Sequence, residues 1–232
     1  MLTKRYRDER GPTHAGWLNS MHSFSFGGYY DQEHMGFASL RVINEDRVIP
    51  GAGFGTHPHN DMEIISYVLS GGLAHKDSMG NGSIIKPGDI QLMSAGSGVA
   101  HSEYNASERE EVHFLQIWIM PNVRNEAPDY QQKSFAPEEL HNTFRTVISP
   151  DGAHQSLVIK QDARMLVGKF DAGTKTVFQT KAKRKYWLQM AQGSAEINGE
   201  HVLAGDGLAI ENEALINVMS RVASEILLFD LF

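Results

Sequence analysis

The sequence predicts an all-β protein made of two tandem β-barrel domains with few short helices. Short runs rich in β-branched and aromatic residues recur along the chain, separated by turns that contain glycine and asparagine. In addition, the second half of the chain repeats the turn spacing of the first half. These observations together favour two similar β-domains over an α/β architecture.

The strand candidates of the first half are rich in valine, isoleucine and aromatic residues, which suit a half-buried pleated surface. They cover residues 41–49, 63–69, 83–86, 89–93 and 111–120. One helix is expected at residues 136–144, because a proline stands near its first turn.

The repeat is carried by two pairs of turns. Asn81-Gly82 precedes Gly88-Asp89, and Asn198-Gly199 precedes Gly205-Asp206 at the same offset. Asn-Gly favours a type I′ hairpin turn, because both residues tolerate a positive φ. We therefore expect an N-terminal domain at residues 1–135 and a C-terminal domain at residues 136–232.

Composition limits the possible functions. The net charge of −7 argues against a general affinity for nucleic acid, and the absence of cysteine excludes disulfides, thiolate metal sites and cysteine nucleophiles. The N-terminus lacks the apolar stretch of a secretory signal, and no apolar run is long enough to cross a membrane. We expect a soluble, cytoplasmic protein that binds no membrane and is monomeric.

The stretch GFGTHPHNDME indicates a metal site. His57 and His59 stand two residues apart, and His101 and Glu103 repeat this step further along the chain. Side chains two apart in a strand project from the same face, roughly 6.6 Å from each other, so each pair can reach one ion. An isolated pair of this kind often binds nothing, but two pairs facing each other would supply four ligands.

The motifs around these residues resemble those of a known family. GAGFGTHPHNDME and GDIQLMSAGSGVAHSEYN resemble the two cupin motifs, although Ser94 stands where proline is usual. Together with GWLNSMHSFSFGGYYD and MGFASLRVIN, they look like the pirin family. The resemblance covers nearly the whole chain and weakens after about residue 121.

The resemblance implies a bicupin, with two jelly-roll (cupin) barrels in one chain. It also implies a mononuclear iron-type ion held by His57, His59, His101 and Glu103 in the N-terminal barrel. Bacterial members suggest quercetin 2,3-dioxygenase activity, with a flavonol and O2 as substrates. Eukaryotic members suggest the alternative, a metal-binding regulatory protein that acts through a protein partner.

Three imidazoles and one carboxylate suit Fe(II), which we expect, and also Mn, Co, Ni, Cu or Zn. Four ligands leave two positions open on an octahedral ion, as an oxygenase requires. The chain contains no GxSxG elbow, GxGxxG fingerprint or P-loop that would indicate another enzyme class.

The carboxylate ligand has two candidates. The general cupin pattern favours Glu63, which lies four residues beyond His59, whereas Glu103 lies only two residues beyond His101. Strand geometry and the pirin resemblance favour Glu103, which we also expect to act as the general base toward a flavonol hydroxyl.

The C-terminal domain is expected to hold no metal. Aligning the glycines of the two repeats places four residues against the ligand positions that do not form a site: Gln179, Lys181, Val218 and Ser220.

Further side chains have weaker signals. Phe54, Phe114 and Trp118 are candidates for an aromatic substrate pocket, although ordinary core is the commoner role for such residues. We expect His22 to pack and form hydrogen bonds, and we assign no function to His75, which carries no spacing signal.

Overall fold

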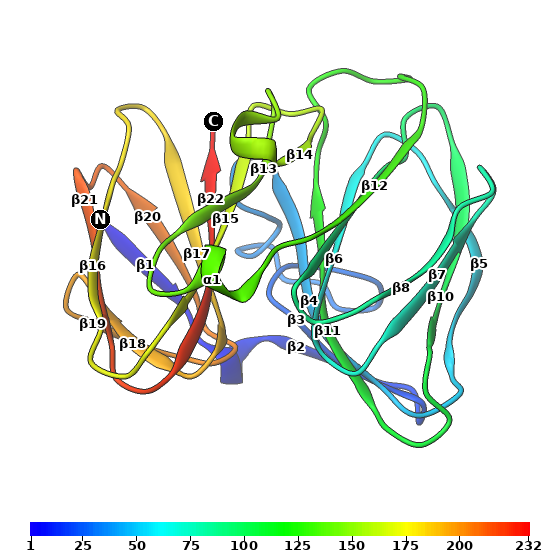
Figure 1. Ribbon diagram of the computed structural model, residues 1–232, viewed down its shortest axis with the longest axis horizontal. Helices are drawn as coiled ribbons and strands as arrows, with labels where there is room; N and C mark the ends of the chain where they lie inside the picture. The colour runs from blue at the N-terminus through cyan, green and yellow to red at the C-terminus, as the bar shows by residue number, and fades with distance from the viewer. The chain divides into compact units, whose positions relative to one another are not determined.

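The β-branched runs of the sequence form strands throughout the computed structural model, which describes residues 1–232 (Figure 1). The chain forms two compact units. The N-terminal unit comprises Gly11–Ser134 and Ile159–Gln161, and the C-terminal unit comprises Met1–Arg10, Phe135–Val158 and Asp162–Phe232. Each unit contains one 7-stranded and one 4-stranded sheet.

The N-terminal unit is all-β. Its strands are β2 (Gly11–His14), β3 (Leu18–His22), β4 (Leu40–Val48), β5 (Gly53–His59), β6 (Glu63–Ser70), β7 (Leu73–Asp77), β8 (Gly82–Ile85), β9 (Asp89–Ser94), β10 (Val99–Asn105), β11 (Val112–Ile119) and β12 (Asp129–Ser134). The larger sheet has the order β12-β9-β6-β11-β4-β3-β2, and the smaller sheet has the order β5-β10-β7-β8.

An apolar core joins the two sheets of the N-terminal unit. Val68 and Phe114 of the larger sheet pack in one cluster with Leu73 and Ile85 of the smaller sheet. These side chains are almost fully buried, and each contributes about 1.5–3 kcal/mol by leaving water. The unit is therefore a sandwich of two open sheets.

The C-terminal unit adds short helical turns to its strands. The strands are β1 (Leu2–Arg5), β13 (Arg145–Ser149), β14 (Leu157–Val158), β15 (Arg164–Phe170), β16 (Lys175–Gln179), β17 (Lys185–Gln192), β18 (Ser194–Ile197), β19 (Glu200–Leu203), β20 (Gly207–Glu211), β21 (Leu215–Ser220) and β22 (Ser224–Leu231). The helical turns are η1 (Arg7–Glu9), α1 (Pro137–Leu140) and η2 (Ala153–Gln155). The sheet orders are β1-β20-β17-β22-β15-β13-β14 and β16-β21-β18-β19.

The two units repeat one topology. The order β12-β9-β6-β11-β4-β3 matches β1-β20-β17-β22-β15-β13, and β5-β10-β7-β8 matches β16-β21-β18-β19. The turn glycines match as well, because Gly71 and Gly193 both have φ 79°, while Gly88 and Gly205 have φ 94° and 90°. The repeat expected from the sequence is thus confirmed as a repeat of fold.

The N-terminal strand belongs to the C-terminal unit. β1 pairs antiparallel with β20, where Leu2 faces Ile210, and takes the place that β12 has in the other unit. Lys4 Nζ also lies 2.9 Å from a carboxylate oxygen of Asp206. The expected division into residues 1–135 and 136–232 differs from this arrangement at Met1–Arg10, at Phe135 and at Ile159–Gln161.

Local expectations differ from the structure in three places. The sheets are open rather than closed barrels, and the helix expected at residues 136–144 is only the single turn α1. Asn198-Gly199 forms the expected turn with φ 47° and 89°, but Asn81-Gly82 has no positive φ. Instead Gly80 has φ 96°, because Asp77 accepts hydrogen bonds from the turn backbone.

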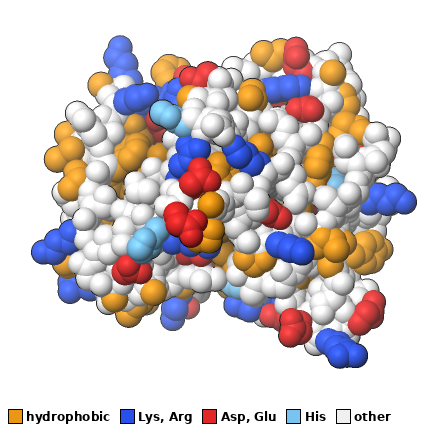
Figure 2. All heavy atoms as spheres, in the orientation of Figure 1, with side chains coloured by type: hydrophobic (Ala, Val, Ile, Leu, Met, Phe, Trp, Pro, Cys, Tyr) orange, Lys and Arg blue, Asp and Glu red, His pale blue; other side chains and the backbone are white.

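No helix of the structure has the length and apolar character needed to cross a membrane. On the face seen in Figure 2, lysine and arginine side chains are interspersed with aspartate and glutamate side chains. Charges of both signs are therefore mixed on this face.

Candidate metal centre

The candidate centre lies on one sheet of the N-terminal unit, where β10 runs between β5 and β7. His57 of β5 pairs directly with His101 of β10. Phe54 and His57 are three positions apart on β5, but their partners Glu103 and His101 are only two positions apart on β10, so the ladder contains a bulge. Pro58 can stand in β5 because β5 is an edge strand.

Three histidine rings meet at this point. The ring centroid of His57 lies 4.8 Å from that of His59 and 4.5 Å from that of His101. The Nε2 atoms of His59 and His101 are 3.0 Å apart. The Nδ1–H of His57 is positioned to donate to the carbonyl oxygen of Gly55 at 2.8 Å, which leaves Nε2 of His57 free for a metal.

Burial keeps two of these imidazoles neutral. Desolvation, with a further contribution from His57, lowers the pKa of His59 to about 4. Desolvation and the neighbouring histidines lower the pKa of His101 to about 3. Neutral imidazoles offer lone pairs, so they are already in the form that a cation requires at neutral pH.

Glu103 lies beside His101, and hydrogen bonds fix its carboxylate. Ser66 Oγ donates to Oε1 at 3.0 Å, and Gln116 Nε2 donates to Oε2 at 2.8 Å. Burial raises the pKa of Glu103 to about 7, and the nearby charge of Asp46 adds to this effect. Its ligand oxygens lie within 4.8 Å of ligand nitrogens of His101 and His75.

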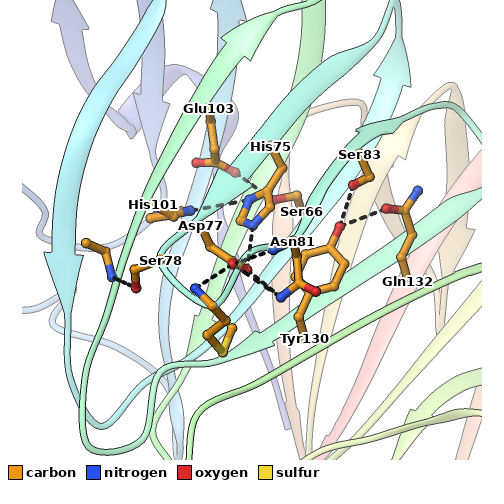
Figure 3. A network of polar contacts seen from close by, with 12 residues as sticks. Ser66, His75, Asp77, Ser78, Asn81, Ser83, His101, Glu103, Tyr130 and Gln132 are labelled. Atoms are coloured by element: carbon orange, nitrogen blue, oxygen red, sulfur yellow. Dashed lines mark hydrogen bonds and ion pairs between the residues drawn. The ribbon is translucent and has the colours of Figure 1, made fainter.

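Sequence reasoning missed His75. It lies on β7 opposite Glu103, whereas Asp77 lies opposite His101. Its Nδ1 atom is 3.5 Å from Nδ1 of His101, and its Nε2 atom is 3.3 Å from Asp77 (Figure 3). The stretch AHKD shows the same two-residue step as the ligand pairs, which was the signal that could have identified it.

Glu63, the alternative carboxylate, lies elsewhere on β6. It is buried, and its Oε2 accepts hydrogen bonds from Ser94 Oγ at 2.8 Å and from the backbone N–H of Lys160 at 3.2 Å. His113 Nε2 likewise pairs with Glu45 at 2.9 Å. Neither Glu63 nor His113 joins a group of potential ligands.

A pocket of about 190 Å³ adjoins the candidate centre at His57 and Glu103. Its wall includes His57, Glu103 and the aromatic rings of Phe26, Phe54 and Trp118. The Trp118 ring stands edge-on to Phe26, with the ring centroids 5.3 Å apart. Aromatic walls next to a carboxylate suit a flat, hydroxylated ligand.

Polar side chains, most of them buried, also line the pocket. His22 Nδ1 lies 2.7 Å from Asn44 Oδ1, and its Nε2 lies 2.8 Å from the hydroxyl of Thr13. Asp46 also lines the pocket and is 3% exposed. His22 thus forms the hydrogen bonds expected of it, while Phe114, another aromatic candidate, is core and does not line the pocket.

The corresponding positions of the C-terminal unit are apolar. In the ladder of β21 with β18, Val218 pairs with Ile197, as Glu103 pairs with His75. Ile216 pairs with Phe178, as His101 pairs with His57. The sequence alignment placed Val218 opposite His101, whereas the register places it opposite Glu103, so that alignment was out of register. Ile197, Ile216 and Val218 belong to an apolar core.

The donor set fits a divalent transition metal. The ligand nitrogens of His57, His59 and His101 all lie within 4.8 Å of one another, and neutral imidazole is a common ligand for zinc, copper, iron and nickel. Glu103 adds a carboxylate oxygen next to His101. Glu103 groups with His101 and His75 rather than with His57 and His59, so His101 is common to both groups of potential ligands.

Comparison with known proteins agrees with the fold. The family described as Pirin matches residues 3–119, and the family described as quercetinase C-terminal cupin domain matches residues 146–231. A protein of Escherichia coli strain K12 named quercetin 2,3-dioxygenase is 45% identical over 231 residues, covering 100% of this chain and 99% of that protein. A pirin-like protein of Caulobacter vibrioides is 40% identical and covers 99% of both chains.

Solved structures give the same result. The bacterial pirin YhhW of Escherichia coli in complex with nickel(II) has a TM-score of 0.95 at 45% identity, covering 100% of this chain and 99% of that chain. A quercetin 2,3-dioxygenase from Acinetobacter baumannii shares the fold with a TM-score of 0.74 at 18% identity, covering 99% of this chain and 78% of that one. The chain, with its two cupin-type domains, therefore belongs to the pirin family.

Proposed function

We propose that the N-terminal unit binds one divalent transition metal ion and acts as a dioxygenase on quercetin-like flavonols. The ligands are His57, His59 and His101 through nitrogen and Glu103 through oxygen. The observation that carries the proposal is the pocket, because its aromatic wall meets two of these residues in one cavity. The bound metal supplies a Lewis acid at which a substrate oxygen and O2 are brought together.

The metal that we propose is Fe(II). The nickel complex of YhhW supports a site for a borderline divalent ion, and the N₃O donor set accommodates Fe, Mn, Co, Ni, Cu and Zn. Selectivity among these metals depends on geometry and availability more than on raw affinity.

The protein groups around the pocket have separate roles. Phe54 and Trp118 present ring faces and edges that bind a planar substrate. Glu103 lines the pocket and accepts the proton of the flavonol hydroxyl. Ser66 and Gln116 hold the carboxylate in place while its charge changes.

A flavonol provides the electrons for its own cleavage. Both atoms of O2 enter the products, and one ring carbon leaves as carbon monoxide. No nicotinamide or flavin is needed, which agrees with the absence of a GxGxxG fingerprint in the sequence.

The test is aerobic incubation of metal-replete protein with quercetin without a reductant. We expect quercetin to be consumed and carbon monoxide to be released in equal amounts, and a His101→Ala variant to lose both. Metal-replete protein that turns over neither quercetin nor other flavonols would refute the proposal. If such protein captured a specific protein partner in a metal-dependent way, the regulatory role of a metal-binding pirin would replace it.

A further inference from the structure

A chain of hydrogen-bonding groups leads from the candidate centre to a turn of the N-terminal unit (Figure 3). It passes from His101 to His75 and then to Asp77, which lie on β10 and β7. The side chains of His75 and Asp77 are fully buried. Neither is among the ligands proposed above.

Asp77 is held as an acceptor by the turn that follows β7. Its Oδ1 accepts hydrogen bonds from the backbone N–H groups of Met79 and Asn81 at 2.9 Å and 3.0 Å. Its Oδ2 accepts one from Asn81 Nδ2 at 2.9 Å. Burial opposes ionisation of Asp77, but the hydrogen bonds from Asn81, His75 and Met79 hold the pKa of the carboxyl below its usual range.

An acceptor at this point determines where the protons of His75 lie. Because the Asp77 carboxylate only accepts, His75 must carry its hydrogen on Nε2, which is 3.3 Å away. A neutral imidazole carries one hydrogen, so Nδ1 of His75 presents a lone pair.

The same reasoning extends to His101. Its Nδ1 atom lies 3.5 Å from the Nδ1 lone pair of His75, so its hydrogen sits on Nδ1. Nε2 of His101 is then left with a lone pair, and this is the atom that faces His59 at 3.0 Å. A metal-binding histidine needs this tautomer, with the remote N–H bonded to an acceptor.

A stacked ring fixes the plane of His75. Tyr130 of β12 lies against it, with centroids 4.9 Å apart and an interplanar angle of 27°. The Tyr130 hydroxyl lies 2.6 Å from Ser83 Oγ and donates to Gln132 Oε1 at 2.8 Å. His75 is therefore held both by its stacking and by its hydrogen bonds.

We propose that Asp77, acting through His75, positions His101 and fixes its tautomer so that Nε2 is free to bind the metal. The proposal rests on the metal site of the proposed function but not on flavonol cleavage. Both residues are positioning residues, because neither contacts the ion or the substrate.

The first test observes the tautomer in metal-free protein by correlated ¹H–¹⁵N spectra of the imidazoles. We expect His101 to carry its hydrogen on Nδ1. In Asp77→Asn, the amide oxygen can still accept the hydrogen bonds of the turn, while the amide N–H₂ donates to Nε2 of His75. The hydrogen of His75 then lies on Nδ1 and is donated to Nδ1 of His101, so that the hydrogen of His101 moves to Nε2. The same His101 tautomer in both proteins would overturn the proposal.

The second test measures metal affinity, by calorimetric titration with Co(II) or Ni(II). Asp77→Asn and His75→Leu should bind roughly 10- to 100-fold more weakly than the wild type. His75→Gln should recover much of the affinity, because its carbonyl can accept from His101 and its amide can donate to Asp77. Unchanged affinity in Asp77→Asn and His75→Leu contradicts the proposal, as does a His75→Gln variant no better than His75→Leu.

His113→Leu is the matched control, since His113 also pairs with a carboxylate but lies outside the candidate centre. It should bind metal like the wild type, and a loss of metal affinity equal to that of His75→Leu would show a general effect of losing a buried histidine.

Two ions bound per chain would also overturn the proposal, because His75 would then be a ligand. Neither test uses quercetin, so failure of flavonol turnover alone would refute the activity and leave the positioning role intact.

Discussion

At the scale of single residues, the centre depends on which ring nitrogen of each histidine is free. The Gly55 carbonyl occupies Nδ1 of His57, and His75 occupies Nδ1 of His101. In both rings Nε2 remains for the ion. Backbone and side-chain acceptors thus direct two nitrogens toward one point before any metal binds.

His101 should be indispensable for metal binding. His101→Ala removes the histidine that contacts His59 and lies beside Glu103, so affinity should fall by more than the roughly 10- to 100-fold that the loss of an outer partner costs. Elemental analysis and circular dichroism of the purified variant would measure metal content and fold. Full metal occupancy in a folded variant would rule out His101 as a ligand.

Glu103 should matter more for turnover than for metal content. Glu103→Gln keeps an oxygen that can bind the ion but removes the base, so turnover should fall roughly 10²- to 10⁴-fold while part of the metal remains. Steady-state kinetics and elemental analysis separate the two effects. Glu63→Gln is the matched control and should retain both, and the opposite ranking would make Glu63 the functional carboxylate.

Asp46 should make stability depend on pH in metal-free protein. Burial raises its pKa from 3.8 to about 7, so the folded state binds an additional proton between these values. Stability must then fall as pH rises through this range, and the full loss is reached above the folded pKa. Asp46→Asn does not titrate, so its melting temperature relative to wild type should be higher at about pH 8 than at about pH 5. A difference that does not change with pH would contradict the shifted pKa.

At the scale of elements, the two-residue step of a strand is what allowed the candidate ligands to be selected from the sequence. His57, His59, His101 and Glu103 could be paired from spacing, since alternate side chains share a face. That His75 lies beside His101 could not be predicted from spacing alone, because its position depends on the register in which β7 pairs with β10. The C-terminal ligand positions were misaligned for the same reason, since loop lengths between strands decide the register and glycine spacing does not.

The turn glycines are the second element-scale feature. Gly193 has φ 79°, and a Cβ there would lie 2.2 Å from the carbonyl oxygen of Ala223. Gly193→Ala should therefore cost more than the roughly 1–3 kcal/mol of the left-handed backbone alone. Gly173 is the matched control, with φ 81° and no atom within 4 Å of such a Cβ. In a denaturant titration, Gly193→Ala should have a clearly lower free energy of unfolding than Gly173→Ala. Equal losses of stability would contradict the close approach of a Cβ at residue 193 to the Ala223 carbonyl oxygen.

At the scale of the whole molecule, the same fold carries polar residues in the interior of one unit and apolar residues at the matching positions of the other. The N-terminal unit places polar residues such as His75 and Glu103 in its interior, whereas the C-terminal unit has Ile197 and Val218 at the matching register positions. The sequence predicted two similar β-units. It could not predict that Leu2–Arg5 completes a sheet of the C-terminal unit, because a strand pairing over such a sequence distance leaves no local pattern.

Removing Met1–Arg10 should therefore weaken the C-terminal unit rather than the metal site. The deletion takes away β1 and the ion pair between Lys4 and Asp206, so backbone amides of β20 lose their partners. Hydrogen exchange followed by mass spectrometry should show faster exchange in β20 and unchanged exchange in β10. Faster exchange confined to the N-terminal unit would contradict the assignment of β1.

The most direct test of the central claim is the anomalous scattering of a crystal of the metal-loaded protein, measured at the absorption edge of the metal. The account predicts one peak per chain, about 2.0–2.2 Å from the Nε2 atoms of His57, His59 and His101 and from a carboxylate oxygen of Glu103. A peak bound by His75 in place of His57 and His59, or a peak in the C-terminal unit, would contradict it.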